Sequence, residues 1–236
     1  EVKEISMEEG VRINIHLAES KSEVDEVVEK HGKGPVEFLD EIGFLSPNLT
    51  AAHCVQLTSD GIETLKRRDV KVVHNPCSNM KLASGIAPVP EMLENGICVA
   101  LGTDGPASNN RLDLFQEMKA AALLHKVNKL DPTVMPAKKI LELATTNGAK
   151  ALGLEREIGS LEIGKKADMV IINLDRPHLQ PIVSNRSLIS HLVYSATGDD
   201  VETVIIDGEV VMKNRAILTV DESKVLDSVN KLKFTT

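Results

Sequence analysis

Four residues able to do chemistry follow one another in the first half of the sequence, each where a short β-branched run ends. His16, His53, His74 and Asp104 are separated by 37, 21 and 30 residues, and Glu19 lies three residues after His16. Imidazole and carboxylate groups are the ligands and the acid–base groups of hydrolytic Zn²⁺ or Fe²⁺ centres. If the fold brings these side chains together, they can hold a divalent metal and move protons beside it.

Each of these residues also has a purely structural interpretation. His16 with Glu19 can be a polar strand cap beside a helix-start acid, His53 a hydrogen-bonded core histidine, and Asp104 part of an ordinary Asp-Gly turn. Their shared position at strand ends favours a common site. The other histidines lie outside this set and are interpreted as surface or packing residues: His31, His125, His178 and His191.

The elements that must position these residues alternate between strand-like and helix-like patterns. The strand-like runs are residues 11–16, 50–54, 71–74 and 97–102, and helix-period stretches at 23–31, 36–42 and 61–68 lie between them. This alternation is typical of βα units around a parallel sheet. In a (β/α)8 barrel the carboxyl ends of the strands open into one mouth, but a whole barrel needs about 250 residues. The sequence therefore predicts an α/β fold, the C-terminal half of a (β/α)8 barrel of the TIM type.

The pattern changes after about residue 157. Helices are predicted from Asn110 to Lys126 and from Pro136 to about Asn147, after a polar loop at 75–85 suited to covering a substrate. The later stretches 159–174 and 201–212 resemble β-hairpins, and 221–234 has apolar residues at the spacing of a packing helix. We expect two parts, residues 1–157 as the half barrel and residues 158–236 as strands of a small β-sandwich with a terminal helix.

Composition excludes several classes of protein. The chain has 27 Lys and Arg against 35 Asp and Glu, a net charge of −8, so nucleic acid is not the expected partner. No apolar run approaches the ~18 residues of a membrane-spanning helix, and the N-terminus has no signal-peptide pattern, which predicts a cytoplasmic protein. Three cysteines indicate reduced thiols rather than a disulfide framework. Since the first residue is Glu, we expect a fragment of a longer chain.

Five stretches together resemble a known family over nearly the whole chain. They are His16-Leu17-Ala18-Glu19, Ala51 to Val55, Asn75 to Gly85, Gly102 to Asn110, and Gly159 to Asp168. In this order they are similar to the amidohydrolase superfamily, and within it to the C-terminal half of the 5-methylthioadenosine/S-adenosylhomocysteine deaminases. The resemblance implies a metal-dependent hydrolase acting on the C–N bond of adenosine analogues, among them 5'-deoxyadenosine and adenosine, with release of ammonia and the inosine analogue.

The resemblance also implies a role for each strand-end residue. His16 and Asp104 are implied as metal ligands, with Zn²⁺ or Fe²⁺ as the metal, and Asp104 also as the base that takes a proton from water. Glu19 is implied to bind the purine ring and pass a proton to it, and His53 to hold the attacking oxygen. Glu19, His53 and Asp104 are thus the expected catalytic and substrate-binding residues.

The family's H-x-H motif, which supplies two further ligands, occurs nowhere in this sequence. The chain by itself is therefore expected to bind metal weakly and to turn over little, and the full-length form is expected to be a homo-oligomer. Other interpretations stay open: a guanine or cytosine deaminase, a triazine chlorohydrolase, or a non-catalytic half-barrel module that works by association.

Overall fold

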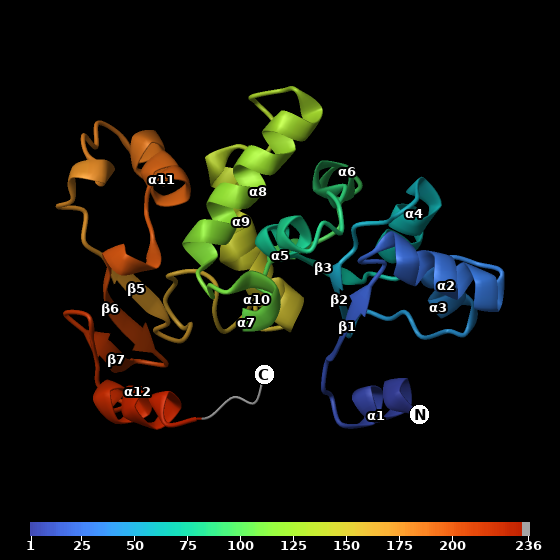
Figure 1. Ribbon diagram of the computed structural model, residues 1–236, viewed down its shortest axis with the longest axis horizontal. Helices are drawn as coiled ribbons and strands as arrows, with labels where there is room; N and C mark the ends of the chain where they lie inside the picture. The colour runs from blue at the N-terminus through green and yellow to red at the C-terminus, as the bar shows by residue number, and fades with distance from the viewer. Residues whose placement is uncertain (233–236) are drawn as a thin grey trace.

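Four parallel strands form the centre of the N-terminal part. The computed structural model describes residues 1–232, and its parallel sheet has the order β1-β2-β3-β4 (Figure 1). The strands are β1 (Ile13–Leu17), β2 (Leu49–His53), β3 (Lys71–His74) and β4 (Val99–Leu101). They differ from the predicted bounds by up to two residues at either end. Consecutive parallel strands with helices between them are the arrangement of a (β/α)8 barrel, so the predicted fold class is confirmed.

Helices connect these strands. After an N-terminal α1 (Val2–Glu8), they are α2 (Lys21–His31), α3 (Pro35–Glu41), α4 (Ser59–Arg67), α5 (Pro76–Lys81) and α6 (Val89–Glu94). Ser20 begins α2 as a capping box: its hydroxyl accepts from the Glu23 backbone N–H, and the Glu23 carboxylate accepts from the Ser20 N–H. Fully buried side chains such as Leu49, Leu65 and Met92 then join sheet and helices in one core.

Two of the predicted helices differ from the observed ones. The helix predicted from Asn110 to Lys126 is α8 (Leu114–Lys129), which begins later with Asp113 as its N-cap, and a short α7 (Pro106–Asn109) precedes it. Asn110 instead takes a left-handed conformation that ends α7. The helix predicted from Pro136 is α9 (Ala137–Ala144), which breaks at Thr145, followed by α10 (Thr146–Leu152).

The C-terminal part is built on a second, antiparallel sheet. Its order is β5-β6-β7-β8, formed by β5 (Met169–Ile172), β6 (Val201–Ile206), β7 (Glu209–Lys213) and β8 (Ala216–Ile217), with α11 (Asn185–Tyr194) inserted before β6. The predicted hairpin at 201–212 is confirmed as β6 and β7. The hairpin predicted at 159–174 is wrong, because only β5 forms there and its partner is β6.

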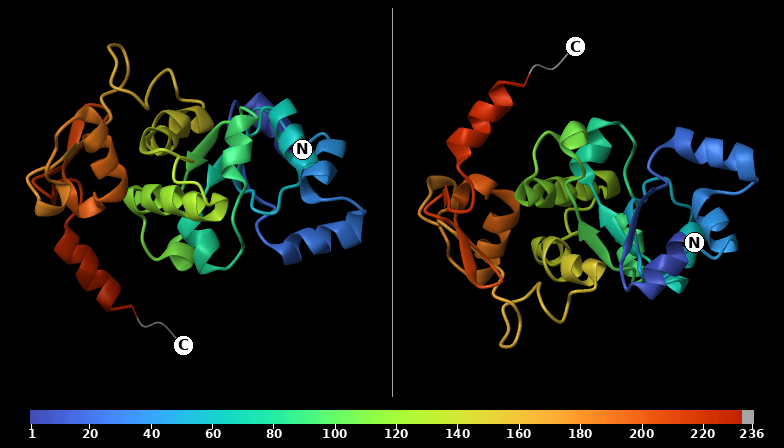
Figure 2. Two further views of the ribbon diagram at one scale, coloured as in Figure 1. Left: turned by 90° about the horizontal axis from the view of Figure 1, so that it is seen from above. Right: turned by 90° about the horizontal axis from the view of Figure 1, so that it is seen from below.

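The last described helix, α12 (Glu222–Asn230), projects from the antiparallel sheet (Figure 2). Val225, Leu226, Val229 and Leu232 are all more than two-fifths exposed, so the prediction that this stretch packs on the rest of the chain is wrong within the described residues. The end of the predicted helix, residues 233 and 234, lies outside the described residues.

Two further expectations concern the thiols and the membrane. The three cysteines are free, with Cys54 buried and Cys77 and Cys98 partly buried, which confirms that they form no disulfide framework. Within residues 1–232 none of the helices combines the length and the apolar character needed to span a bilayer.

We predict that Gly102 just after β4 tolerates no side chain. A Cβ added there meets Val73 Cγ1 at 2.6 Å and Asn75 Oδ1 at 3.1 Å. Gly102→Ala is therefore expected to lower the free energy of unfolding by about 1–3 kcal/mol through overpacking. The matched control is Gly148→Ala inside α10, where the nearest atom is 4.0 Å away. Removing that helical glycine is expected to stabilise by about 0.5–1 kcal/mol. Equal melting temperatures for the two variants would contradict the prediction.

Candidate active site

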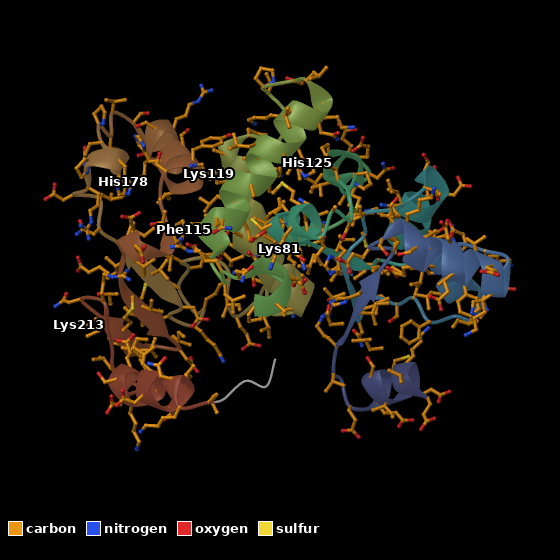
Figure 3. All side chains as sticks on the ribbon, in the orientation of Figure 1. Lys81, Phe115, Lys119, His125, His178 and Lys213 are labelled. Atoms are coloured by element: carbon orange, nitrogen blue, oxygen red, sulfur yellow. The ribbon has the colours of Figure 1, made fainter. Side chains whose placement is uncertain are left out.

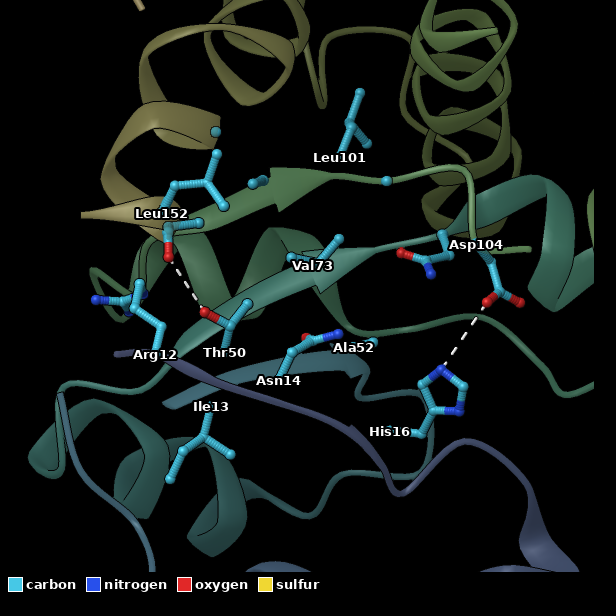
Figure 4. Close-up of a pocket in the computed structure, with 15 residues that line it drawn as sticks. Arg12, Ile13, Asn14, His16, Thr50, Ala52, Val73, Leu101, Asp104 and Leu152 are labelled. Atoms are coloured by element: carbon cyan, nitrogen blue, oxygen red, sulfur yellow. Dashed lines mark hydrogen bonds and ion pairs between the residues drawn. The ribbon is translucent and has the colours of Figure 1, made fainter. Parts of the chain in front are cut away.

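His16 and Asp104 face each other across the carboxyl edge of the parallel sheet. His16 Nε2 lies 3.9 Å from Asp104 Oδ1 (Figure 4). Asp104 comes three residues after β4 and has a left-handed backbone, with φ of 58°. Non-glycine residues rarely adopt this conformation, and it is found preferentially where function demands a particular side-chain direction. The His16 side chain is 61% exposed and that of Asp104 only 16%, so the pair lies at the mouth of the half barrel.

Glu19 and His53 form a second pair beside the first. His53 Nε2 lies 3.7 Å from Glu19 Oε2. The rings of His16 and His53 meet edge to face with 4.7 Å between centroids, so the two pairs adjoin. His53 is fully buried, also has a left-handed backbone with φ of 71°, and its Nε2 accepts or donates no hydrogen bond within the described residues. A buried nitrogen left free in this way is suited to hold a ligand atom.

The segment after β3 supports three of these four residues. Ser78 donates to Asp104 Oδ2 at 2.7 Å, Asn79 Oδ1 lies 2.8 Å from His53 Nδ1, and Ser84 donates to Glu19 Oε1 at 3.1 Å. The sequence predicted this stretch as a loop that covers a substrate, but its first part is the helix α5. Its polar side chains hold the site residues in place. The many serine and asparagine residues of this stretch indicate that it can form such hydrogen bonds, but the sequence alone does not identify the residues that it binds.

Hydrogen bonds set the charge of Asp104. Partial burial of this carboxyl group opposes its ionisation, but hydrogen bonds from Ser108 and Ser78 outweigh burial and hold the pKa of Asp104 below its ordinary value. Both serines donate to Oδ2, with Ser108 at 2.5 Å. Oδ1, the oxygen nearer His16, thus remains available as a ligand or as a proton acceptor.

His74 is the strand-end residue that the structure separates from the others. It is fully buried, and its Nε2 lies 3.2 Å from Nε2 of His125 on α8. The prediction that His125 is a surface or packing residue is confirmed, because His125 is fully buried in the core. His178 lies in the C-terminal part, among the elements around the antiparallel sheet (Figure 3). Removal from water lowers the pKa of both members of the buried pair, that of His125 to about 4. His74 and His125 are thus a neutral structural pair.

A cavity of about 560 Å³ opens on the sheet face next to His16 and Asp104. Polar and apolar side chains line it, among them Asn14, Thr50 and Leu101 (Figure 4). Thr50 reaches across to donate to the backbone oxygen of Ala151 at 3.1 Å. Such a cavity offers room for a ligand beside the two site pairs.

The donor atoms are close enough for one metal ion. Two ligands that each lie ~2.1 Å from an ion can be no more than about 4.2 Å apart, and the His16–Asp104 separation of 3.9 Å meets this limit. His16, Glu19 and His53 also offer ligand atoms within 4.8 Å of one another, a wider spacing that needs the side chains to move. A nitrogen and a carboxylate oxygen are a donor set that zinc accepts.

Comparison with known proteins identifies the family of the chain. The sequence profile of the amidohydrolase family matches residues 1–211. The chain belongs to the amidohydrolase family. It is 54% identical to the 5'-deoxyadenosine deaminase of Methanosarcina acetivorans, over 96% of this chain and 51% of that relative. It is 51% identical to the 5-methylthioadenosine/S-adenosylhomocysteine deaminase of Thermoanaerobacter pseudethanolicus, over 98% of this chain and 53% of that relative.

Solved structures share the fold of this amidohydrolase chain. An adenosine deaminase from Xanthomonas campestris with bound zinc superposes with a TM-score of 0.93 at 36% identity, over 98% of this chain and 52% of that one. An atrazine chlorohydrolase from Arthrobacter aurescens complexed with zinc gives 0.88 at 25% identity, over 97% and 50%. The chain thus spans about half the length of the relatives that it matches.

We predict that Asn79 fixes the ring of His53. Asn79→Ala leaves the buried Nδ1 of His53 without its partner at 2.8 Å, which is expected to cost about 1–3 kcal/mol of unfolding free energy. Chemical denaturation measures the loss, and Asn230→Ala at the exposed end of α12 is the matched control. An unfolding free energy equal to that of the control would refute this role for Asn79.

The buried histidine pair predicts a loss of stability in acid. Because the folded pKa of His125 is about 4 and that of an unfolded histidine ~6.5, the unfolded chain binds the proton first as the pH falls. Stability is thus full above pH ~6.5 and declines between pH ~6.5 and 4, by at most about 1.4 kcal/mol per pH unit for each histidine. His125→Gln is expected to flatten this decline in urea titrations, whereas His31→Gln at an exposed position is not.

Proposed function

We propose that the whole protein containing this chain is a metal-dependent hydrolytic deaminase of adenosine analogues. The observation that carries the proposal is the pairing of His16 with Asp104 at 3.9 Å beside His53 and Glu19 at 3.7 Å, in one mouth. Deaminase names of relatives at 51% to 54% identity support it. In the reaction, water adds to the purine carbon that bears the amino group, the C–N bond breaks, and ammonia leaves with formation of the inosine analogue.

We assign His16 and Asp104 as the metal ligands that this chain supplies, since their spacing fits one ion without rearrangement. The relatives crystallised with zinc favour Zn²⁺, and Fe²⁺ is the other candidate. A divalent metal at this position supplies activation of water near neutral pH. Catalytic zinc commonly has three protein ligands, so we infer that the remaining ones come from residues outside this chain.

The other polar groups divide the proton transfers between them. Asp104, kept ionised by Ser78 and Ser108, takes a proton from the attacking water. His53 holds the attacking water through Nε2, the atom left free in the structure, because its Nδ1–H donates to Asn79 Oδ1. Glu19, held by Ser84, passes a proton to the ring nitrogen, and Asp104 passes the proton that it took from water to the leaving amine. Glu19 recovers a proton from the added hydroxyl as the C=O bond of the inosine analogue forms and ammonia leaves.

We propose that residues 1–157 are half of the barrel and that residues 158–236 are part of a small β-domain. We also propose that the full-length protein is cytoplasmic, that it contains the complete barrel, and that it forms a homo-oligomer. The substrate is a small nucleoside rather than a nucleic acid, in keeping with the net charge of −8.

A second candidate function is hydrolysis of a triazine-type ring, because the atrazine chlorohydrolase shares the fold at a TM-score of 0.88. The higher identity and TM-score of the adenosine deaminase favour the nucleoside. Guanine or cytosine deamination and a non-catalytic association module remain as further alternatives.

We predict loss of ammonia release on substitution of either ligand. His16→Ala and Asp104→Ala in the full gene product are each expected to lower kcat/KM for 5'-deoxyadenosine and S-adenosylhomocysteine by at least about 1,000-fold, since each removes a metal ligand. Asp175→Ala in the C-terminal part, at an exposed position, is the control. Coupled ammonia assays and metal analysis measure both effects. A metal-free wild-type protein that releases no ammonia from any of these substrates would instead favour the association module.

A further inference from the structure

Glu117, which is not one of the four site residues, has a carboxylate buried in the core. It lies on α8, its side chain is fully buried, and no ion pair among residues 1–232 includes it. A carboxylate removed from water costs several kcal/mol unless hydrogen bonds compensate. The hydrogen bonds of the Glu117 carboxylate must therefore compensate for its burial.

Two hydrogen bonds connect Glu117 to two short helices. Its Oε2 accepts from the backbone N–H of Cys77 in α5 at 3.1 Å, and its Oε1 accepts from Asn109 Nδ2 in α7 at 2.7 Å. The same Asn109 nitrogen donates to the backbone oxygen of Thr103, next to Asp104, at 2.6 Å. Lys81, which is labelled in Figure 3, is the last residue of α5. It also joins α5 to α7 by donating to the Ala107 backbone oxygen at 2.8 Å.

These two helices carry the serines that hold Asp104. Ser78 directly follows Cys77, and Ser108 directly precedes Asn109. Both hydroxyls donate to Asp104 Oδ2, at 2.7 and 2.5 Å. Each bond of Glu117 thus fixes the residue adjacent to one that orients Asp104. The chain of contacts runs from α8 through α5 and α7 to the carboxylate that faces His16.

We propose that Glu117 is a positioning residue for the reaction: by binding α5 and α7 at once, it keeps Asp104 Oδ2 occupied by two serines and Oδ1 directed at the metal position. The proposal rests on the proposed function for its catalytic consequence. The hydrogen bonds of Glu117 are to Cys77 and Asn109, so Glu117 acts on His16 and Asp104 only through other residues.

An amide cannot replace the carboxylate in this position. Both partners, the Cys77 N–H and Asn109 Nδ2, are donors, so both oxygens of residue 117 must accept. Glu117→Gln keeps the size but sets an NH₂ group against one of the two donors. Burial raises the pKa of Glu117, and the hydrogen bonds from Cys77 and Asn109 oppose that rise only in part.

The test compares Glu117→Gln with Asp200→Asn in the full gene product. Asp200 is a matched control because it is also a buried carboxylate, accepting from His178 at 3.0 Å and from the Thr197 N–H at 2.9 Å beside the antiparallel sheet. Three quantities are measured for each protein: melting temperature, zinc affinity by competition with a chelator, and kcat and KM for 5'-deoxyadenosine. Asn109→Ala serves as a second variant that keeps the carboxylate and removes one of its bonds.

Glu117→Gln is expected to weaken zinc binding about 10-fold or more, because substitution of residues that support metal ligands commonly has an effect of this size. It is also expected to lower kcat about 10-fold, with KM changed by no more than about twofold. Asn109→Ala is expected to act in the same direction, while Asp200→Asn lowers only the melting temperature. The proposal is overturned if Glu117→Gln loses stability like the control but keeps wild-type zinc affinity and kcat. If the wild-type protein binds zinc without releasing ammonia, the deaminase function fails, and the zinc affinities still decide the role of Glu117.

Discussion

The parallel pairing of β1 to β4 is the constraint on which the site depends. Parallel strands end at the same edge of a sheet, and the observed register sets Leu17 beside His53 and His74 beside Leu101. Residues at or near the carboxyl ends of successive strands therefore come close in space although they lie 21 to 37 residues apart in sequence. Left-handed backbones at His53 and Asp104 then direct two of these side chains into the mouth.

Hydrogen bonds from neighbouring residues orient the side chains of Asp104, His53 and Glu19. The segment after β3 supplies a hydroxyl to Asp104, an amide to His53 and a second hydroxyl to Glu19. Each bond occupies one polar atom of its partner, and the other polar atom makes no hydrogen bond within residues 1–232. Preorganisation of this kind lets groups of ordinary chemistry act together, because their orientation is fixed before the substrate binds.

Periodicity and strand-end position predicted the parallel sheet, the fold class and the meeting of His16, Glu19, His53 and Asp104, since these depend on local pattern and on the geometry common to all βα units. Contacts between distant parts of the chain could not be predicted in this way. Ser84 meets Glu19 across 65 residues, and His74 follows the strand-end rule yet turns toward α8. The false hairpin at 159–174 has the same cause, because β5 pairs with a strand about 30 residues later.

We propose that a metal lies between His16 and Asp104, with His53 and Glu19 beside it for the substrate. Anomalous diffraction at the zinc absorption edge, on crystals of the full gene product, locates the ion directly. A peak ~2.1 Å from both His16 Nε2 and Asp104 Oδ1 is the predicted result. A peak coordinated by His16, Glu19 and His53, with Asp104 more than about 3 Å away, would contradict the assignment of ligand and base.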